Sequence, residues 1–251
     1  MDAQYGPLSA EFYQITKPIE ADYPDVPYYL EALEGVTGKV LEIGAGTGRL
    51  VIPLVESGIK VESLEPSQHM ASWLEKNLKA RKLKSPIHRK VAEDFVTEGT
   101  YSAIVVSFGS FQLFEPFDVA AKCLKNFHRS LAKGGRLFID VDVFRPEPHK
   151  AGIKTHGTRV PTEDGGFILL EGARNWDLVE QVEHVHLRYE KWKNDKLVAT
   201  EVQDFSLRGY GHREFTWLLR EVGFKKIELT GDYGHEELHP DTATFCFVAT
   251  K

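Results

Sequence analysis

A glycine-rich segment at residues 42–48 restricts the fold of this chain more than any other feature of the sequence. It holds glycine at positions 44, 46 and 48 and directly follows the β-branched run that begins at Lys39. A turn of this kind between a strand and a helix bares backbone N–H groups at the helix N-terminus, where a ligand can approach closely. The segment therefore predicts a ligand-binding turn at the carboxyl end of a buried strand.

Short apolar runs alternate with amphipathic stretches from residue 38 to residue 141. This pattern predicts strands at 39–43, 60–65, 102–106 and 136–141, a weaker strand at 87–91, and helices at 68–81 and 119–131. We expect Gly134 and Gly135 to stop the second helix. Near-continuous apolar strands are typical of a sheet that is covered on both faces.

The pattern changes after residue 146, where strict alternation replaces the buried runs. It predicts a hairpin with arms at 182–193 and 196–207, inside an antiparallel β insertion at 146–207 that forms a lid or acceptor wall. A helix at 212–221 and strands at 226–229 and 244–249 then complete the first pattern. We therefore predict an α/β fold: a Rossmann-like, mostly parallel seven-stranded sheet with helices on both faces and the insertion between strands 5 and 6. Residues 1–251 form a single domain, which begins with an N-terminal helical cap at 1–35.

Composition limits the partners and the compartment. The net charge is −6, which gives no basic field for nucleic acid, so we expect none as a partner. No run of about 18 apolar residues and no basic, apolar leader occur, so we expect a cytoplasmic protein without membrane contact. Cys123 and Cys246 lack CxxC spacing, as expected of a reducing compartment.

The segment at 235–239 fits the HExxH pattern of zinc hydrolases. That pattern needs a helix to bring both imidazoles onto one face, whereas Gly234 precedes the segment and Pro240 follows it. The pair His184 and His186 on a strand is a weak metal signal without further ligands. The sequence therefore predicts no metal site.

Charges near the glycine turn discriminate between ligands. A GxGxxG dinucleotide site requires glycine at position 49, where this chain has Arg49. Glu42, just before the turn, repels a pyrophosphate and attracts a cationic or ammonium-bearing ligand. Glu65 ends the second strand about 20 residues after the turn, where a carboxylate can accept hydrogen bonds from both hydroxyls of a ribose. Together these residues favour a sulfonium amino acid over a dinucleotide.

Three segments resemble successive motifs of the class I S-adenosylmethionine-dependent methyltransferases. They are residues 40–48, residues 65–70 and residues 131–137, and residues 209–224 are similar to the closing helix of that family. The insertion and the N-terminal tyrosines are similar to small-molecule enzymes such as the sugar-amine N-methyltransferases. The resemblance implies transfer of a methyl group from S-adenosylmethionine to nitrogen or oxygen of a small molecule, with S-adenosylhomocysteine as product.

The resemblance also implies a cofactor site. It places the glycine turn beside the methionine moiety, Glu42 near its charged end, Glu65 on the ribose and Met70 against the adenine. Val91 stands where the family often has an acid, so Glu93 or the backbone of Ala92 is the expected contact of the adenine amine. The expected cofactor-binding residues are Tyr13, Glu42, Gly44, Ala45, Gly46, Gly48, Glu65, Pro66, Met70, Ala92, Glu93 and Ser107.

Methyl transfer is an in-line displacement, for which the enzyme must hold the acceptor lone pair within ~3–3.5 Å of the methyl carbon in a dry pocket. By resemblance, the loop at 107–112 runs past the sulfonium towards the substrate, and Tyr13 closes over the cofactor unless it is an aromatic core anchor. Tyr13 and Gln112 are therefore the catalytic candidates. The substrate candidates follow strands at the sheet edge and are Gln112, Asp142, Arg145, His149 and Tyr210, with Arg208 and His212 nearby.

Two other functions are compatible with the same residues: a non-catalytic S-adenosylmethionine or nucleoside sensor, and a nicotinamide oxidoreductase. Turnover of an acceptor excludes the first, and cofactor binding tests the second. The apolar face of the hairpin is compatible with a homodimer.

Overall fold

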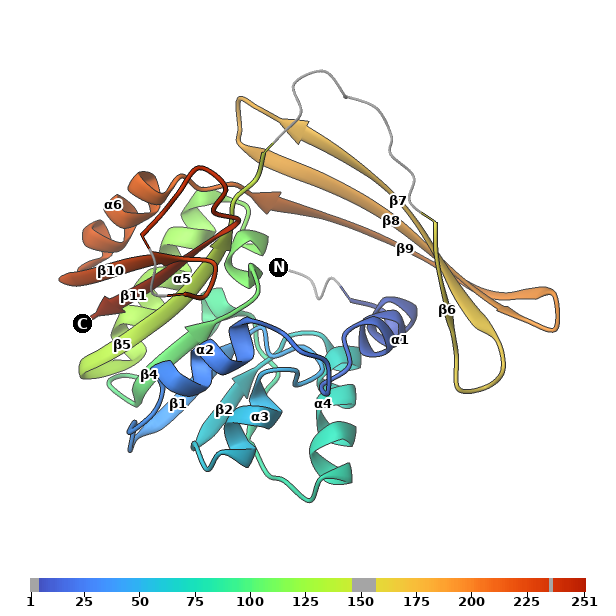
Figure 1. The fold of residues 1–251 in the computed structure, drawn as a ribbon, viewed down its shortest axis with the longest axis horizontal. Coiled ribbons are helices and arrows are strands. Elements are labelled where there is room, and N and C mark those ends of the chain that lie inside the picture. The colour runs from blue at the N-terminus through green and yellow to red at the C-terminus, as the bar shows by residue number, and fades with distance from the viewer. Residues whose placement is uncertain (1–4, 146–156, 235–236) are drawn as a thin grey trace.

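The computed structural model describes residues 5–145, 157–234 and 237–251 (Figure 1). Its central sheet has seven strands in the order β10-β11-β5-β4-β1-β2-β3. Neighbours among β1 to β5 pair in parallel, whereas β11 runs antiparallel to both β5 and β10. The bounds are β1 Lys39–Ile43, β2 Val61–Leu64, β3 Ile87–His88, β4 Tyr101–Val106, β5 Leu131–Asp142, β10 Lys226–Gly231 and β11 Thr244–Thr250. The predicted fold class is confirmed.

Helices cover both faces of this sheet, which explains why its strands are apolar throughout. Consecutive residues of β4, Ile104 and Val105, are both fully buried but belong to clusters on opposite faces, because side chains of a strand alternate. The first cluster includes Phe127 and Phe215, and the second includes Leu74. The helices are α1 Pro7–Thr16, α2 Asp25–Ala32, α3 Val51–Glu56, α4 Gln68–Ala80, α5 Phe117–Ser130 and α6 His212–Val222, with the 3₁₀ turns η1 Ala92–Asp94 and η2 Ser110–Leu113.

The predicted stop of α5 was wrong. The helix ends at Ser130, and Gly134 and Gly135 lie inside β5 instead of capping the helix. Gly134 adopts a left-handed φ of 74°. A Cβ at Gly135 would lie 2.9 Å from the Ala132 carbonyl oxygen and 3.1 Å from that of Tyr101. The two glycines therefore accommodate an irregularity in the pairing of β5 with β4, and they are needed for close backbone approach.

The insertion is a separate antiparallel sheet in the order β6-β7-β8-β9 that extends away from the central sheet (Figure 1). Its strands are β6 Thr158–Pro161, β7 Phe167–Asp177, β8 Val182–Lys193 and β9 Lys196–Arg208. The predicted hairpin is thus β8 and β9, joined by Asn194 and Asp195 with φ of 51° and 58°. Ile168 of β7 and Tyr189 of β8, on the inner face of the insertion sheet, pack against Phe12 of α1.

The two helices of the expected N-terminal cap contact different parts of the molecule. Helix α1 lies between the insertion sheet and α4, and Figure 1 shows it bridging the two. Helix α2 packs on α3, and its Tyr29 is buried in the cluster on that face of the central sheet. The insertion sheet therefore obtains part of its apolar core from a segment about 150 residues earlier in the chain.

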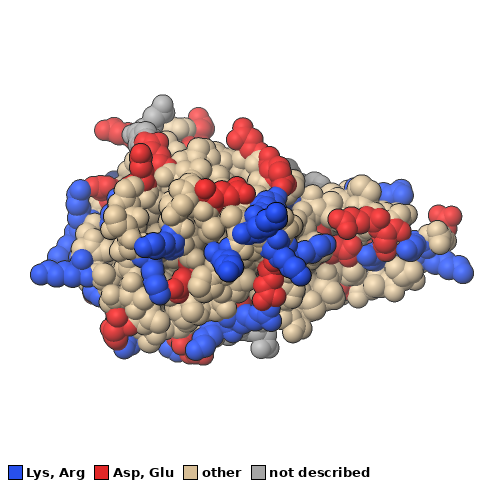
Figure 2. Space-filling model, turned by 90° about the horizontal axis from the view of Figure 1, so that it is seen from below, with Lys and Arg blue, Asp and Glu red and all other residues tan. Residues whose placement is uncertain are grey.

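Charged side chains are spread over the surface. On the face drawn in Figure 2, Lys and Arg lie interspersed with Asp and Glu, as is typical of solvated protein surface. Among the helices of the described residues, none is both long and apolar enough to cross a bilayer.

Candidate active site

A pocket lies at the carboxyl edge of β1, β2 and β4, under α1. Eight of the expected cofactor residues line it: Tyr13, Gly44, Gly46, Glu65, Pro66, Met70, Ala92 and Glu93. The remaining lining consists of Tyr5, Ile43, Leu64, Ser67, Val91, Ser110, Leu113 and Phe114. The carboxyl edge is where open α/β sheets bind their ligands.

The glycine turn presents bare backbone to this pocket. Gly44 and Gly46 have left-handed φ of 71° and 57°. A Cβ at Gly46 would meet no atom closer than the Gly44 carbonyl oxygen at 4.0 Å, so it would enter open space beside the pocket. Gly48 has a different function, because a Cβ there would lie 2.5 Å from Cδ1 of Leu74. Gly48 and the buried Ala45 are outside the lining, and they pack the turn rather than face the pocket.

Glu65 organises the turn from the end of β2. Its Oε2 accepts the Gly46 N–H at 2.8 Å, and its Oε1 accepts the Ser67 N–H at 2.9 Å. Burial raises the pKa of Glu65 to about 7, against the opposing effect of these two hydrogen bonds. A carboxylate offers about four lone-pair sites, so each oxygen can still accept a hydrogen bond from a ribose hydroxyl.

Glu42 is a buried acid just before the turn. Its Oε1 accepts the Ser107 hydroxyl at 3.3 Å, while Oε2 has no hydrogen-bond partner among the described residues. Burial raises its pKa to about 8, and nearby Arg49 acts in the opposite direction. An orphaned buried carboxylate oxygen and a bare glycine cradle fit a ligand that carries an ammonium group. Neither Glu42 nor Ser107 lines the pocket itself: Glu42 lies just before the lining residues Ile43 and Gly44, and Ser107 orients it.

Arg49 fills the position where a dinucleotide site needs glycine. Its guanidinium forms a buried bidentate pair with Asp25, at 2.7 and 2.6 Å, and lies 4.6 Å from the Tyr23 ring centroid and 4.4 Å from that of Phe108. Sequence reasoning missed this cluster, because Asp25 lies 24 residues away and no local motif marks it.

Met70, Val91, Ala92 and Glu93 form the opposite end of the pocket. Ser67 caps α4 by accepting the Met70 N–H at 3.3 Å, as predicted. Asn126 of α5 donates to the Glu93 carbonyl oxygen at 2.9 Å, which fixes η1. Met70 is 1% exposed, so the small free surface of its apolar side chain is the surface that lines the pocket.

Two tyrosines from the N-terminal segment form the wall under α1. The rings of Tyr5 and Tyr13 meet edge to face, with centroids 6.0 Å apart. Burial raises the pKa of Tyr13, although Arg49 opposes the shift. The phenol therefore stays protonated at neutral pH and can donate a hydrogen bond, but it is not a base.

The loop after β4 supplies Ser110, which lies inside the predicted loop at 107–112, and Leu113 and Phe114, which lie just beyond it and were not predicted. Phe108 and Gly109 in this loop have left-handed φ of 58° and 66°. Asp140 of β5 holds the loop, because its Oδ1 accepts the Gly109 N–H at 2.7 Å and its Oδ2 accepts the Tyr29 hydroxyl at 2.6 Å. The position of the loop after a parallel strand is a signal that could have identified these residues.

Gln112 does not line the pocket. Its Nε2 donates to the carbonyl oxygens of Asp142 at 3.2 Å and Arg208 at 3.0 Å, and its Oε1 accepts the Asp142 N–H at 2.8 Å. The amide thus joins the ends of β5 and β9, which gives Gln112 a structural function, and its contact with the substrate stays a prediction. Tyr210 is also outside the lining and packs between Phe111 and Phe215.

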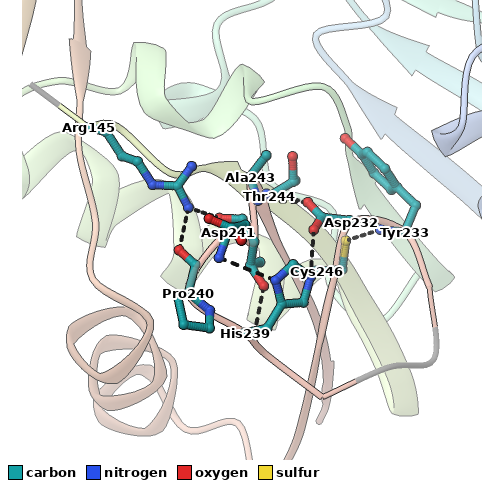
Figure 3. A network of polar contacts seen from close by, with 10 residues as sticks. Arg145, Asp232, Tyr233, His239, Pro240, Asp241, Ala243, Thr244 and Cys246 are labelled. Atoms are coloured by element: carbon teal, nitrogen blue, oxygen red, sulfur yellow. Dashed lines mark hydrogen bonds and ion pairs between the residues drawn. The ribbon is translucent and has the colours of Figure 1, made fainter.

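The structure places Arg145 away from the pocket, in the network of Figure 3. It donates to the carbonyl oxygens of Pro240 at 2.9 Å and Thr242 at 2.8 Å, in the β10–β11 connection. Asp142, also expected at the substrate, accepts the Thr244 hydroxyl at 3.3 Å. His149 lies outside the described residues, as do His235 and Glu236 of the HExxH segment. The described residues contain no group of three potential metal ligands.

Comparison with known proteins identifies the class. Residues 40–135 match the family described as "Methyltransferase domain". The chain is 25% identical over 246 residues to YqeM of Bacillus subtilis (strain 168), which is named as a methyltransferase, with 96% of this chain and 91% of that protein covered. An S-adenosylmethionine-dependent methyltransferase from Clostridium acetobutylicum ATCC 824 has a similar structure, with a TM-score of 0.79, 14% identity and 96% of each chain covered. The sugar N-methyltransferase KedS8 from Streptoalloteichus sp ATCC 53650 gives a TM-score of 0.72 and 20% identity over 96% of this chain and 90% of that chain.

Residues 40–135 thus form a methyltransferase domain, and the chain has the fold of S-adenosylmethionine-dependent methyltransferases. The chain is therefore an enzyme, a transferase whose cofactor is S-adenosylmethionine.

Proposed function

We propose that this enzyme methylates a small molecule at nitrogen or oxygen, and that an amine is the preferred acceptor. The observation that carries the proposal is the charge of the pocket: its lining includes Glu65 and Glu93, and none of the described residues that line it is Lys or Arg. Such a pocket attracts a basic acceptor and repels an anionic one. The name of KedS8, a sugar N-methyltransferase of similar fold, supports an amine.

Each part of the cofactor has its own set of contact residues along the pocket. The ammonium end of the cofactor is held by Glu42 and the backbone of Gly44 and Gly46. Glu65 holds the ribose. The adenine is held by Met70, Ala92 and Glu93. S-adenosylmethionine, when bound, supplies an electrophilic methyl group on a sulfonium. Tyr5, Tyr13 and Phe114 surround the remaining space with aromatic surface, which excludes water from the reacting atoms.

The chemistry needs little acid–base help from the protein. With S-adenosylmethionine bound, a neutral acceptor lone pair would bond to the methyl carbon as the sulfur–carbon bond electrons returned to sulfur. A methylated amine would then lose its proton to water. We assign Tyr13 to positioning the acceptor through its protonated phenol. The insertion sheet, with α1 beneath it, forms the acceptor wall.

The test is isothermal titration of the protein with S-adenosylhomocysteine and with NAD, followed by assays for methylated product with a panel of amino sugars, matched hydroxy sugars and sugar acids. We expect binding of the nucleoside without binding of NAD, and turnover of amines above that of acids. Preference for a sugar acid would contradict the amine assignment. Absence of turnover with every acceptor despite tight nucleoside binding would favour the non-catalytic alternative.

A further inference from the structure

The N-terminal turn of α1 is capped by a residue of the insertion sheet. Helix α1 starts at Pro7 after the N-cap Gly6, which has no side chain to accept the first free N–H groups. Glu201 of β9 accepts them: its Oε2 lies 2.7 Å from the Leu8 nitrogen, and its Oε1 lies 3.2 Å from the Ser9 nitrogen. A carboxylate at this end of a helix also interacts favourably with the helix dipole.

Position 6 has room for the Glu201 carboxylate because glycine has no side chain. A Cβ at Gly6 would lie 2.6 Å from Cδ of Glu201 and 2.7 and 2.8 Å from its carboxylate oxygens. Any larger residue would displace the carboxylate from the helix N-terminus. The absence of a side chain at Gly6 and the presence of Glu201 thus belong to one arrangement.

A second ionic contact joins the same two elements. Lys191 of β8 lies 2.9 and 3.0 Å from the two carboxylate oxygens of Glu11, three residues after Leu8 on α1. Lys191 is partly buried, and Glu11 holds its pKa above the ordinary value despite the opposing effect of burial. The insertion therefore holds α1 at two points in addition to the apolar contact of Phe12 with Tyr189.

Helix α1 carries the tyrosine wall of the cofactor pocket. Tyr13 lies on the helix and Tyr5 just before it, and both line the pocket. The carbonyl oxygen of Tyr5 accepts the hydroxyl of Ser67 at 2.9 Å, and the N–H of Ser67 donates to Glu65. These hydrogen bonds, together with the backbone from Tyr5 to Leu8, therefore connect the insertion sheet to Glu65.

We propose that Glu201 is a positioning residue for the cofactor: it docks α1 on the insertion sheet so that Tyr5 and Tyr13 close the pocket, and the acceptor wall and the cofactor site form one mechanical unit. Its carboxylate touches neither ligand. The inference rests on the proposed function only in taking this pocket as the cofactor site.

The test uses Glu201→Ala, Glu201→Gln and, as matched control, Asp204→Ala, an exposed acid on β9 that contacts only His186 in the described structure. Because the N-terminal turn of α1 loses its cap, we expect S-adenosylhomocysteine to bind Glu201→Ala about tenfold more weakly. Glu201→Gln should recover part of this loss, because an amide oxygen still accepts one N–H. Asp204→Ala should bind as the unmodified protein does.

Two readouts separate positioning from general destabilisation. Hydrogen exchange of the Leu8 and Ser9 amides should accelerate in Glu201→Ala but not in Asp204→Ala. The bound nucleoside should slow this exchange in the unmodified protein and in Asp204→Ala, but not in Glu201→Ala. Gly6→Ala should weaken binding as Glu201→Ala does, whereas adding Gly6→Ala to Glu201→Ala should cause little further loss, because the displaced carboxylate is gone.

The outcomes are distinct. Unchanged nucleoside affinity of Glu201→Ala together with unchanged exchange of α1 would overturn the inference. Strictly additive losses for Gly6→Ala and Glu201→Ala would also overturn it. If the unmodified protein binds no nucleoside, the proposed function fails instead, while the exchange of α1 in Glu201→Ala still tests the docking.

Discussion

The central sheet and the insertion sheet are both built from long strands, but they bury their side chains differently. In β4, the residues from Ala103 to Val106 are all fully buried on two faces. In β9, Val198 and Val202 are 55% and 65% exposed, whereas the polar Gln203 is buried. The central sheet is fixed by apolar packing on both faces, and this packing holds its ligand-binding edge in place. The second is fixed to the rest of the molecule by α1 and a few polar contacts, so its outer face can vary at little cost.

A paired substitution provides the strongest test of this difference. Ile104→Ala should lower the free energy of unfolding by ~2–5 kcal/mol, because it leaves a cavity in a core that cannot collapse. Val202→Ala, on the exposed face of β9, should change it by no more than about 0.5 kcal/mol. Chemical denaturation of both variants measures the two values. Equal losses would mean that the insertion sheet is packed as tightly as the central one.

The second test concerns the glycine turn at the ligand-binding edge of the central sheet. Gly46→Val should weaken S-adenosylhomocysteine binding by about a hundredfold or more, because the side chain enters the space that the ligand needs. Gly99→Val is the matched control, since Gly99 has the same φ of 57° and also has no atom within 4 Å of its would-be Cβ. Both variants should lose similar stability from backbone strain, but only the first should lose binding in calorimetric titration. A normal affinity of Gly46→Val would remove the turn from the cofactor site.

A third test concerns a single side chain at the ligand-binding edge of the central sheet, Glu65. Glu65→Ala should weaken nucleoside binding by ~1–3 kcal/mol, because the ribose hydroxyls lose charge-assisted hydrogen bonds and the turn loses its anchor at Gly46. Glu56→Ala, a change at a surface acid of α3 with 51% side-chain exposure, should leave binding unchanged. Titration calorimetry compares the two variants. An unaltered dissociation constant in Glu65→Ala would exclude the ribose assignment.

The pH dependence of binding should show the smallest effect. Burial raises the pKa of Glu65 to about 7 and that of Glu42 to about 8 in the free enzyme. A ligand that donates hydrogen bonds and carries an ammonium group favours the ionised carboxylates, so binding releases protons and affinity rises from pH 6 to pH 8.5. The gain is at most about tenfold per pH unit for each proton released.

The measurement is the dissociation constant of S-adenosylhomocysteine across this range in two buffers of different ionisation enthalpy. Glu42→Gln should reduce the number of protons released. Because both folded-state pKa values are raised, the same groups make the free enzyme less stable as pH rises through 7 and 8, and bound ligand should oppose that loss. A flat profile with no proton release would show that these acids do not face the ligand.

The sequence determined the parts of this protein that depend on local pattern. Apolar periodicity located the strands of the central sheet and helices α4, α5 and α6 to within about five residues, because burial on both faces of a parallel sheet leaves a clear signal. The spacing of Gly44, Gly46 and Glu65 placed the pocket for the same reason, since a turn after one strand and an acid after the next meet at one edge. The assignment of Gly134 and Gly135 as the stop of α5 was wrong, because glycine suits a strand irregularity as well as a helix stop.

Only the tertiary structure decided which side chains reach the pocket. Gln112, Arg145 and Tyr210 follow strands as substrate residues do. Partners far away in the chain engage them, however: backbone carbonyls contact Gln112 and Arg145, and Phe111 contacts Tyr210. Tyr5 reaches the pocket through a contact with Ser67, 62 residues later, and Glu201 reaches Leu8 at the start of α1, 193 residues earlier. Pairings over such distances leave no periodic trace in the sequence, because only the packing of the folded chain brings the partners together.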